Sequence, residues 1–190
     1  MTFPVYLIGY MGAGKTTAGK LLADKLGWYF VDLDAAFEEI HGLSPAEYIR
    51  EYGIDDFRKK EKYVVEDLAD AAPVEKVVYA TGGGYPCWED NMECLKELGT
   101  SIYLRWKPEH LAKRLMLTDL SERPVLQGKT EEELLACILP QLEAREPYYA
   151  QADIIIDVPL QTAKHRDSLS PDDDEQIAEH LCQLIKSRTK

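Results

Sequence analysis

The chain has 190 residues, of which 45% are hydrophobic, and it carries a formal net charge of −12. This composition suits one globular domain with a full core, and no apolar run is long enough to span a membrane. The negative charge argues against a general nucleic-acid surface, which needs a basic face. The four scattered cysteines lack a C-x-x-C pair, so we expect reduced thiols. Because the N-terminus resembles no signal segment, we expect a cytoplasmic protein.

The first predicted elements are a strand and a helix joined by a glycine-rich loop. Residues Val5–Ile8 are typical of a buried strand, and apolar residues recur at helical spacing in Lys15–Leu26. Between them, Gly9–Thr16 matches the pattern G-x-x-x-x-G-K-[ST], whose backbone N–H groups hold nucleotide phosphates. In this pattern Lys15 reaches the β- and γ-phosphates, and the Thr16 hydroxyl ligates Mg²⁺. The predicted ATP-binding residues here are Gly12, Ala13, Gly14, Lys15, Thr16 and Thr17.

A glycine-rich turn with a chance lysine is the alternative interpretation of this loop. The position between a strand and a helix favours the nucleotide site. The loop alone does not separate kinases from GTPases or motor ATPases. However, the chain is short for a motor and carries no N-K-x-D guanine-binding signature, so a small-molecule kinase is the simplest class.

Acidic residues follow the second predicted strand, Tyr29–Val31. Asp32 and Asp34 stand two apart at its carboxyl end, the edge where open parallel sheets bind ligands. Such carboxylates can accept a hydrogen bond from a substrate hydroxyl or hold a magnesium-bound water. The alternative is a helix cap, with Asp34 capping a helix that starts at Ala35. The stretch 34–72 is too long for one helix, and we expect two or three.

A charged run within that stretch contains Arg58 and Glu61, three residues apart on one predicted helical face. A glutamate that fixes a guanidinium prepares it to bind a carboxylate through two hydrogen bonds. For the neighbouring Lys59 and Lys60 we favour a solvated surface.

Three consecutive glycines, Gly82, Gly83 and Gly84, follow the third predicted strand, Val77–Ala80. A flexible turn would explain them, but their place at the same sheet edge favours close approach of a ligand or another backbone.

The remaining strands are predicted at Ser101–Leu104 and Ile154–Ile156. Alternating strands and helices predict an α/β fold with a central, five-stranded parallel sheet flanked by helices. Arg145 ends a predicted helix before Pro147, which we expect to stop it. Arg123 lies in a polar segment that we expect to form a mobile lid at about 113–130. A polar loop at 160–174 is predicted to precede a final amphipathic helix.

Taken in order, these motifs resemble the shikimate kinase family. The resemblance runs from about Val5 to Asp157 and consists of G-Y-M-G-A-G-K-T, D-L-D, F-R-x-x-E, T-G-G-G, R-P and R-x-P-x-Y. It implies a single P-loop kinase domain over residues 1–190, similar to nucleoside monophosphate kinases, with a substrate-binding helical segment at about 34–62. It also implies that the chain phosphorylates the 3-hydroxyl of shikimate with MgATP, in the pathway to chorismate and the aromatic amino acids.

The resemblance also implies a role for each matching residue. Asp34 corresponds to the base at the acceptor hydroxyl. Lys15 and Arg123 correspond to the cations around the transferring phosphoryl group. Residues that correspond to the shikimate site are Arg58, Arg145, Gly82, Gly83 and Gly84. Thr16 and Asp32 fall in the magnesium environment, and Arg114 corresponds to a basic residue near adenine.

Two other interpretations stay open from the sequence. Another small P-loop kinase, such as a gluconate kinase, would share the phosphate loop but would not require both Arg58 and Arg145. A nucleotide-binding relative without turnover would be marked by loss of Asp34, Arg58 or Arg123, and all three are present. We expect shikimate and ATP as the only partners, and a monomer.

Overall fold

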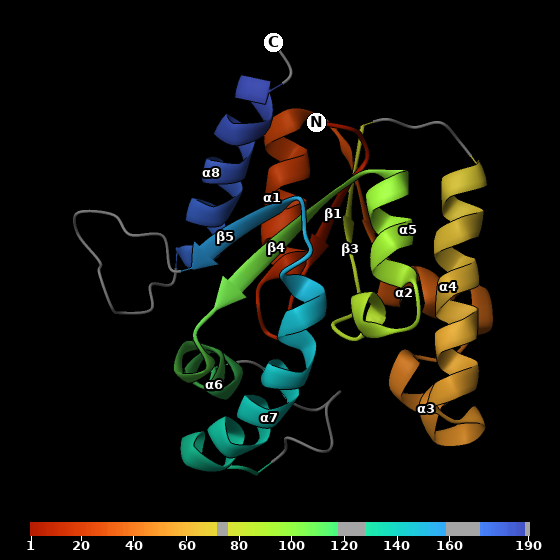
Figure 1. Cartoon of the computed structure of the whole chain (residues 1–190), viewed down its shortest axis with the longest axis vertical. Helices are drawn as coiled ribbons and strands as arrows, with labels where there is room; N and C mark the ends of the chain where they lie inside the picture. The colour runs from red at the N-terminus through yellow and green to blue at the C-terminus, as the bar shows by residue number, and fades with distance from the viewer. Residues whose placement is uncertain (72–75, 118–127, 159–171, 189–190) are drawn as a thin grey trace.

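The computed structural model describes residues 1–71, 76–117, 128–158 and 172–188 (Figure 1). Its sheet has the strand order β2-β3-β1-β4-β5, and every neighbouring pair is parallel. The strands are β1 Val5–Ile8, β2 Tyr29–Asp32, β3 Val77–Ala80, β4 Thr100–Trp106 and β5 Ile154–Val158. The helices are α1 Lys15–Leu26, α2 Leu33–His41, α3 Pro45–Tyr52, α4 Ile54–Ala71, η1 Tyr85–Cys87, α5 Asn91–Leu98, α6 Pro108–Met116, α7 Glu131–Tyr149 and α8 Asp173–Arg188. The predicted five-stranded parallel sheet is confirmed.

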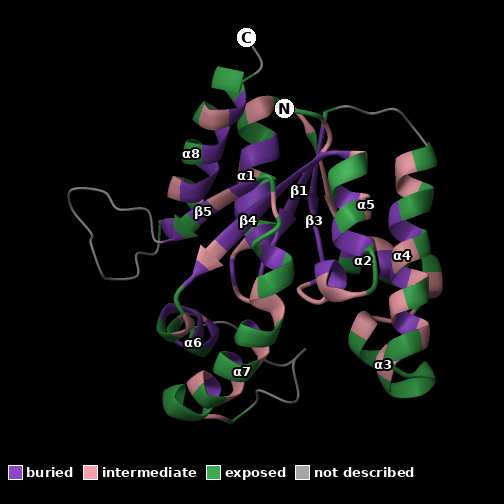
Figure 2. Cartoon of the chain, viewed as in Figure 1, coloured by how far each residue is buried: buried purple, intermediate pink, exposed green. Residues whose placement is uncertain are grey.

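The central strands β1 and β3 form because short, continuously apolar runs are covered on both faces of the sheet. All four residues of β1 are buried, as are all four of β3 (Figure 2). Helix α1 lies behind β4 in the view of Figure 1 and packs against α8, whereas α5 lies in front of the sheet. Because all the strands are parallel, their carboxyl ends share one edge, which is where the predicted site residues gather.

A second, smaller core holds the helices that follow β2. It consists of Phe37, Tyr48, Phe57 and Val64, which pack α2, α3 and α4 together. The rings of Phe37 and Phe57 meet edge to face, with their centroids 4.9 Å apart. Phe57 immediately precedes Arg58, so this core fixes the helical turn that carries the arginine.

Three details correct the expectations from the sequence. Asp32, not Asp34, caps α2, because its Oδ1 accepts hydrogen bonds from the N–H groups of Asp34 and Ala35. Pro147 does not stop α7, which runs on to Tyr149. A proline in the last turn removes only one N–H donor, and Ala150 N still bonds Glu146 O at 2.8 Å.

The third correction concerns the predicted loop at 160–174, since α8 already begins at Asp173. Residues 160–171 of that loop and residues 118–127 of the predicted lid, including Arg123, lie outside the described residues. No helix within the described part of the chain is long and apolar enough to cross a membrane.

Candidate active site

The phosphate loop connects β1 to α1, as the motif predicts. Gly12 and Gly14 have positive φ angles of 77° and 85°, a conformation that favours glycine. The buried Lys15 ammonium donates hydrogen bonds to the carbonyl oxygens of Gly9 at 2.9 Å and Tyr10 at 3.0 Å. The lysine therefore lies back across its own loop, at the N-terminus of α1 where an anion is favoured.

Thr16 and Asp32 form the candidate magnesium environment beside this loop. The Thr16 hydroxyl donates to Asp32 Oδ2 at 2.7 Å, while Asp32 Oδ1 caps α2. A hydroxyl and a carboxylate are hard oxygen donors, which Mg²⁺ prefers and which it supplements with phosphate oxygens and water. The described residues contain no group of three or more His, Cys, Asp or Glu that could hold a metal. The pair thus fits an ion that is held in part by its nucleotide.

The triple glycine is the point at which the acceptor residues meet. A Cβ atom on Gly82 would lie 2.6 Å from Glu61 Oε1 and 2.9 Å from Asp34 Oδ1. On Gly84 it would lie 2.0 Å from Arg58 Nη2, and on Gly83 3.6 Å from Arg145 Nη1. Glycine at positions 82 and 84 therefore lets two carboxylates and the Arg58 guanidinium approach the turn closely, and the Arg145 guanidinium lies at ordinary contact distance from Gly83.

Arg58 is held by Glu61, as their spacing predicts. The Arg58 guanidinium donates to Glu61 Oε2, and both side chains are largely buried. Among the described residues, Glu61 Oε1 has no hydrogen-bond partner. Burial raises the pKa of Glu61 to about 7, although the Arg58 charge opposes the rise. The pair is therefore pre-formed, but its negative charge is costly to keep in this place.

Arg145 reaches the same turn from α7. Its guanidinium lies over the Tyr10 ring, 5.2 Å from the centroid, where the π face attracts a cation. One helical turn further, the buried Tyr149 hydroxyl donates to the carbonyl oxygen of Gly83. Tyr149 is the tyrosine of the R-x-P-x-Y motif, but the sequence analysis gave it no role and ended the helix before Pro147. The spacing of four residues from Arg145 could have placed both on one face.

The acceptor turn also touches the phosphate loop. A Cβ atom on Gly83 would lie 3.3 Å from the N atom of Met11 and 3.4 Å from the O atom of Gly9. Just before it, the Thr81 N–H donates to the carbonyl oxygen of Leu7 at 3.1 Å. The backbone thus brings Asp34, Arg58 and Arg145 next to the loop that carries Lys15.

Arg114 lies apart from this group, on the α6 side of the phosphate loop. Its Nε donates to the Gly12 carbonyl oxygen at 2.9 Å, and its guanidinium stacks on Trp106, 4.6 Å from the ring centroid. Trp106 ends β4, the strand next to β1, so its position at the sheet edge was a usable signal that we did not take up. Asp174, which bonds Arg114 at 2.8 Å, stands in a stretch that we predicted as a loop.

Comparisons with known proteins agree with the motifs. The family model described as shikimate kinase matches residues 11–186. A shikimate kinase of Parabacteroides distasonis is 44% identical over 153 residues, which cover 80% of this chain and 86% of that protein.

Among solved structures, shikimate kinases also match this chain. The crystal structure of shikimate kinase from Bacteroides thetaiotaomicron has a TM-score of 0.83 at 37% identity and covers 96% of this chain and 97% of that chain. The shikimate kinase from Acinetobacter baumannii, solved in complex with shikimate, has a TM-score of 0.74 at 32% identity. The match covers 97% of this chain and 93% of that chain.

Proposed function

The chain belongs to the shikimate kinase family, and we propose that it transfers the γ-phosphoryl group of ATP to the 3-hydroxyl of shikimate through the residues described above. The observation that carries this proposal is the meeting of Arg58 and Arg145 on the triple glycine, beside Asp34 and the phosphate loop. Two guanidinium groups on one turn suit an acceptor that carries a carboxylate.

On the acceptor side, Arg58 and Arg145 bind the substrate carboxylate, and the backbone of Gly82, Gly83 and Gly84 lies against the ring. Seating the carboxylate fixes which hydroxyl faces the phosphate loop, so binding supplies orientation as well as affinity. Asp34 then accepts the hydroxyl proton as the oxygen attacks phosphorus. Its carboxylate lies against Gly82, which supports this role.

On the donor side, the loop backbone from Gly12 to Thr17, including Ala13, Gly14 and Thr16, surrounds the phosphates of ATP, and Lys15 and Arg123 balance the charge of the transferring group. Phosphoryl transfer has a loose transition state, so placement and charge supply most of the catalysis. Arg114 lies against the nucleotide base. Thr16 and Asp32 would hold Mg²⁺, which neutralises phosphate charge when it is bound.

An acceptor panel tests this proposal. Wild-type protein is offered shikimate, gluconate and nucleoside monophosphates with MgATP, and ADP release is followed in a coupled assay. We expect turnover with shikimate alone, and a much higher KM for shikimate in the Arg145→Ala variant. Turnover with gluconate but not with shikimate would contradict the proposal, as would shikimate binding without any ADP.

We propose a monomer as the active unit. Sedimentation at the concentration used in the assay tests this point.

A further inference from the structure

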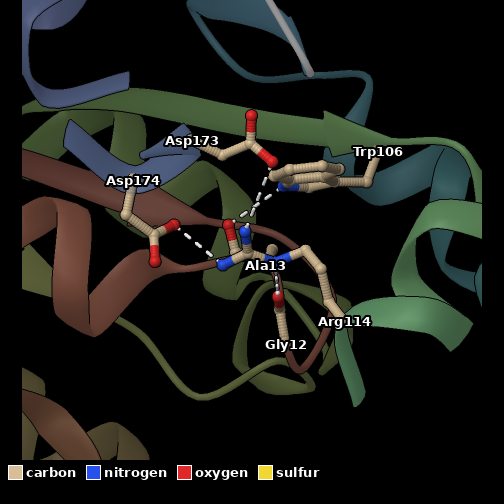
Figure 3. A network of polar contacts seen from close by, with 6 residues as sticks. All are labelled: Gly12, Ala13, Trp106, Arg114, Asp173 and Asp174. Atoms are coloured by element: carbon tan, nitrogen blue, oxygen red, sulfur yellow. Dashed lines mark hydrogen bonds and ion pairs between the residues drawn. The ribbon is translucent and has the colours of Figure 1, made fainter. Parts of the chain in front are cut away.

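The outer side of the phosphate loop carries a polar network that the acceptor chemistry does not use (Figure 3). The Trp106 indole donates from Nε1 to the carbonyl oxygen of Ala13 at 3.0 Å. Arg114 Nε donates to the carbonyl oxygen of Gly12 at 2.9 Å. Two successive carbonyl groups of the loop are therefore turned toward β4 and α6.

This orientation has a consequence for the loop N–H groups. In a planar trans peptide unit, the carbonyl of one residue and the N–H of the next point in opposite directions. Holding the Ala13 carbonyl toward Trp106 therefore directs the Gly14 N–H away from it. The Ala13 N–H, on the far side of the preceding peptide unit, bonds the Tyr10 carbonyl oxygen at 3.2 Å and closes the loop.

Arg114 is itself fixed from three sides. Its guanidinium stacks on Trp106, and its Nη2 donates to Asp174 Oδ1 at 2.8 Å. Asp173 Oδ2 lies 3.9 Å from Nη1. Asp173 and Asp174 form the first turn of α8, which packs along α1. The arginine therefore links the start of the C-terminal helix to the phosphate loop.

Asp174 also touches the loop directly. A Cβ atom on Gly14 would lie only 2.1 Å from Asp174 Oδ1, so α8 begins in van der Waals contact with the loop backbone. Burial raises the pKa of the Asp174 carboxyl, and the Arg114 charge and hydrogen bond oppose the rise. Burying a carboxylate at this position costs free energy, and a function of Asp174 beyond folding would account for that cost.

We propose that Trp106, Arg114 and Asp174 form a brace that holds the phosphate loop in its ATP-binding conformation, with Trp106 and Asp174 as positioning residues for the nucleotide. The brace rests on the proposed function only in taking ATP as the ligand of this loop. It acts on the nucleotide side, because Trp106, Arg114 and Asp174 contact Gly12, Ala13 and Gly14 of the loop, whereas the acceptor residues meet at the triple glycine after β3.

Trp106→Phe tests the brace with the smallest change, since it keeps an aromatic face for Arg114 and removes only the indole N–H. Trp88→Phe is the matched control, because Trp88 Nε1 is buried and has no hydrogen-bond partner among the described residues. Titration calorimetry measures the Kd for ATP and, separately, for shikimate. We expect Trp106→Phe to raise the ATP Kd about five- to tenfold, the loss of one hydrogen bond to a buried acceptor. The shikimate Kd should stay within about twofold, because Trp106 touches no acceptor residue.

Asp174→Asn tests the contribution of the Asp174 carboxylate to the brace, because asparagine has the same size but no charge. Its control is Glu179→Gln, which removes the same charge from the same helix, where Glu179 pairs with Lys25 at 3.2 Å. We expect the ATP Kd to rise about fivefold for Asp174→Asn, because the charge-assisted hydrogen bond to Arg114 is lost. The ATP Kd should stay unchanged for Glu179→Gln.

Two results overturn the brace. One is an ATP Kd that is the same in either variant as in its control. The other is an equal rise in the ATP and shikimate Kd values, which would indicate a general loss of structure. Melting temperatures confirm that each variant is folded. If the wild type binds ATP but does not phosphorylate shikimate, the proposed function fails while the ATP Kd values still decide on the brace.

Discussion

Replacing Glu61 with glutamine tests the electrostatics of the acceptor site. The wild-type carboxyl ionises near pH 7 in the folded protein, against 4.5 as its ordinary value, because burial disfavours the charge. Between these two pH values the unfolded chain has released a proton that the folded chain still holds. The unfolded state then binds fewer protons, so the stability contributed by this group falls as pH rises from 4.5 to 7.

The size of the effect follows from the shift. At about 1.36 kcal/mol per pKa unit, the rise from 4.5 to about 7 corresponds to a penalty on the order of 3 kcal/mol above pH 7. The penalty is absent below pH 4.5. Glutamine does not titrate, so the Glu61→Gln variant lacks this dependence. The free energy of unfolding of the wild type minus that of the variant should therefore decrease by about 3 kcal/mol across the window.

Urea denaturation at half-unit pH steps from 4 to 8 measures both free energies. Taking the difference removes the other titrating groups, which the two proteins share. Glu66→Gln serves as the control, since Glu66 is exposed on the same helix. The reasoning would be refuted if the difference in unfolding free energy between the wild type and Glu61→Gln stayed constant or increased with pH.

Further outcomes are expected at neighbouring positions. Asp34→Asn should lower kcat about a hundredfold or more, as expected for loss of a general base, with little change in the KM for ATP; retention of most turnover would remove its assignment. Arg58→Ala should raise the KM for shikimate by about tenfold or more through loss of a charge-assisted bond, and an unchanged KM would contradict the carboxylate clamp. Gly84→Ala places a methyl group 2.0 Å from Arg58 Nη2, so it should raise the same KM while leaving the ATP Kd unchanged; an unaltered KM would show that the guanidinium moves freely. Thr130→Ala removes the side-chain cap of α7 and should destabilise the protein by about 1 kcal/mol in urea, with no such loss for Thr17→Ala as a comparison.

The strands were predictable because a parallel sheet buries both faces, so each strand is a short apolar run. The prediction for β1 and β3 matches the structure residue by residue, whereas β4 continues two residues past its predicted end. The prediction that α7 ends before Pro147 was wrong. A proline near a helix terminus removes only one backbone hydrogen bond, and the buried Tyr149 keeps the last turn in place.

Asp34 and the triple glycine could be placed for a different reason. They follow the ends of β2 and β3, and a parallel sheet brings such positions together whatever the intervening helices do. Arg58 and Arg145 lie within helices α4 and α7, so only the resemblance predicted that they reach the same turn. Trp106 could have been placed at the same edge because it ends β4, whereas Asp174 could not be assigned in this way. The contacts of both residues depend on how α6 and α8 pack on the finished sheet, which local pattern does not encode. For Asp174, the run of aspartates also favoured a loop.

The contact between Gly83 and the loop residues Gly9 and Met11 sets a geometric limit on the reaction. Donor and acceptor backbones are joined at this point and, through the Thr81–Leu7 bond, across two adjacent strands. The packing of the fold thus sets how far the phosphate loop lies from the acceptor turn. A closing segment would then exclude water and add the charge proposed for Arg123, and a change of acceptor would come from the surrounding side chains rather than from a wider gap.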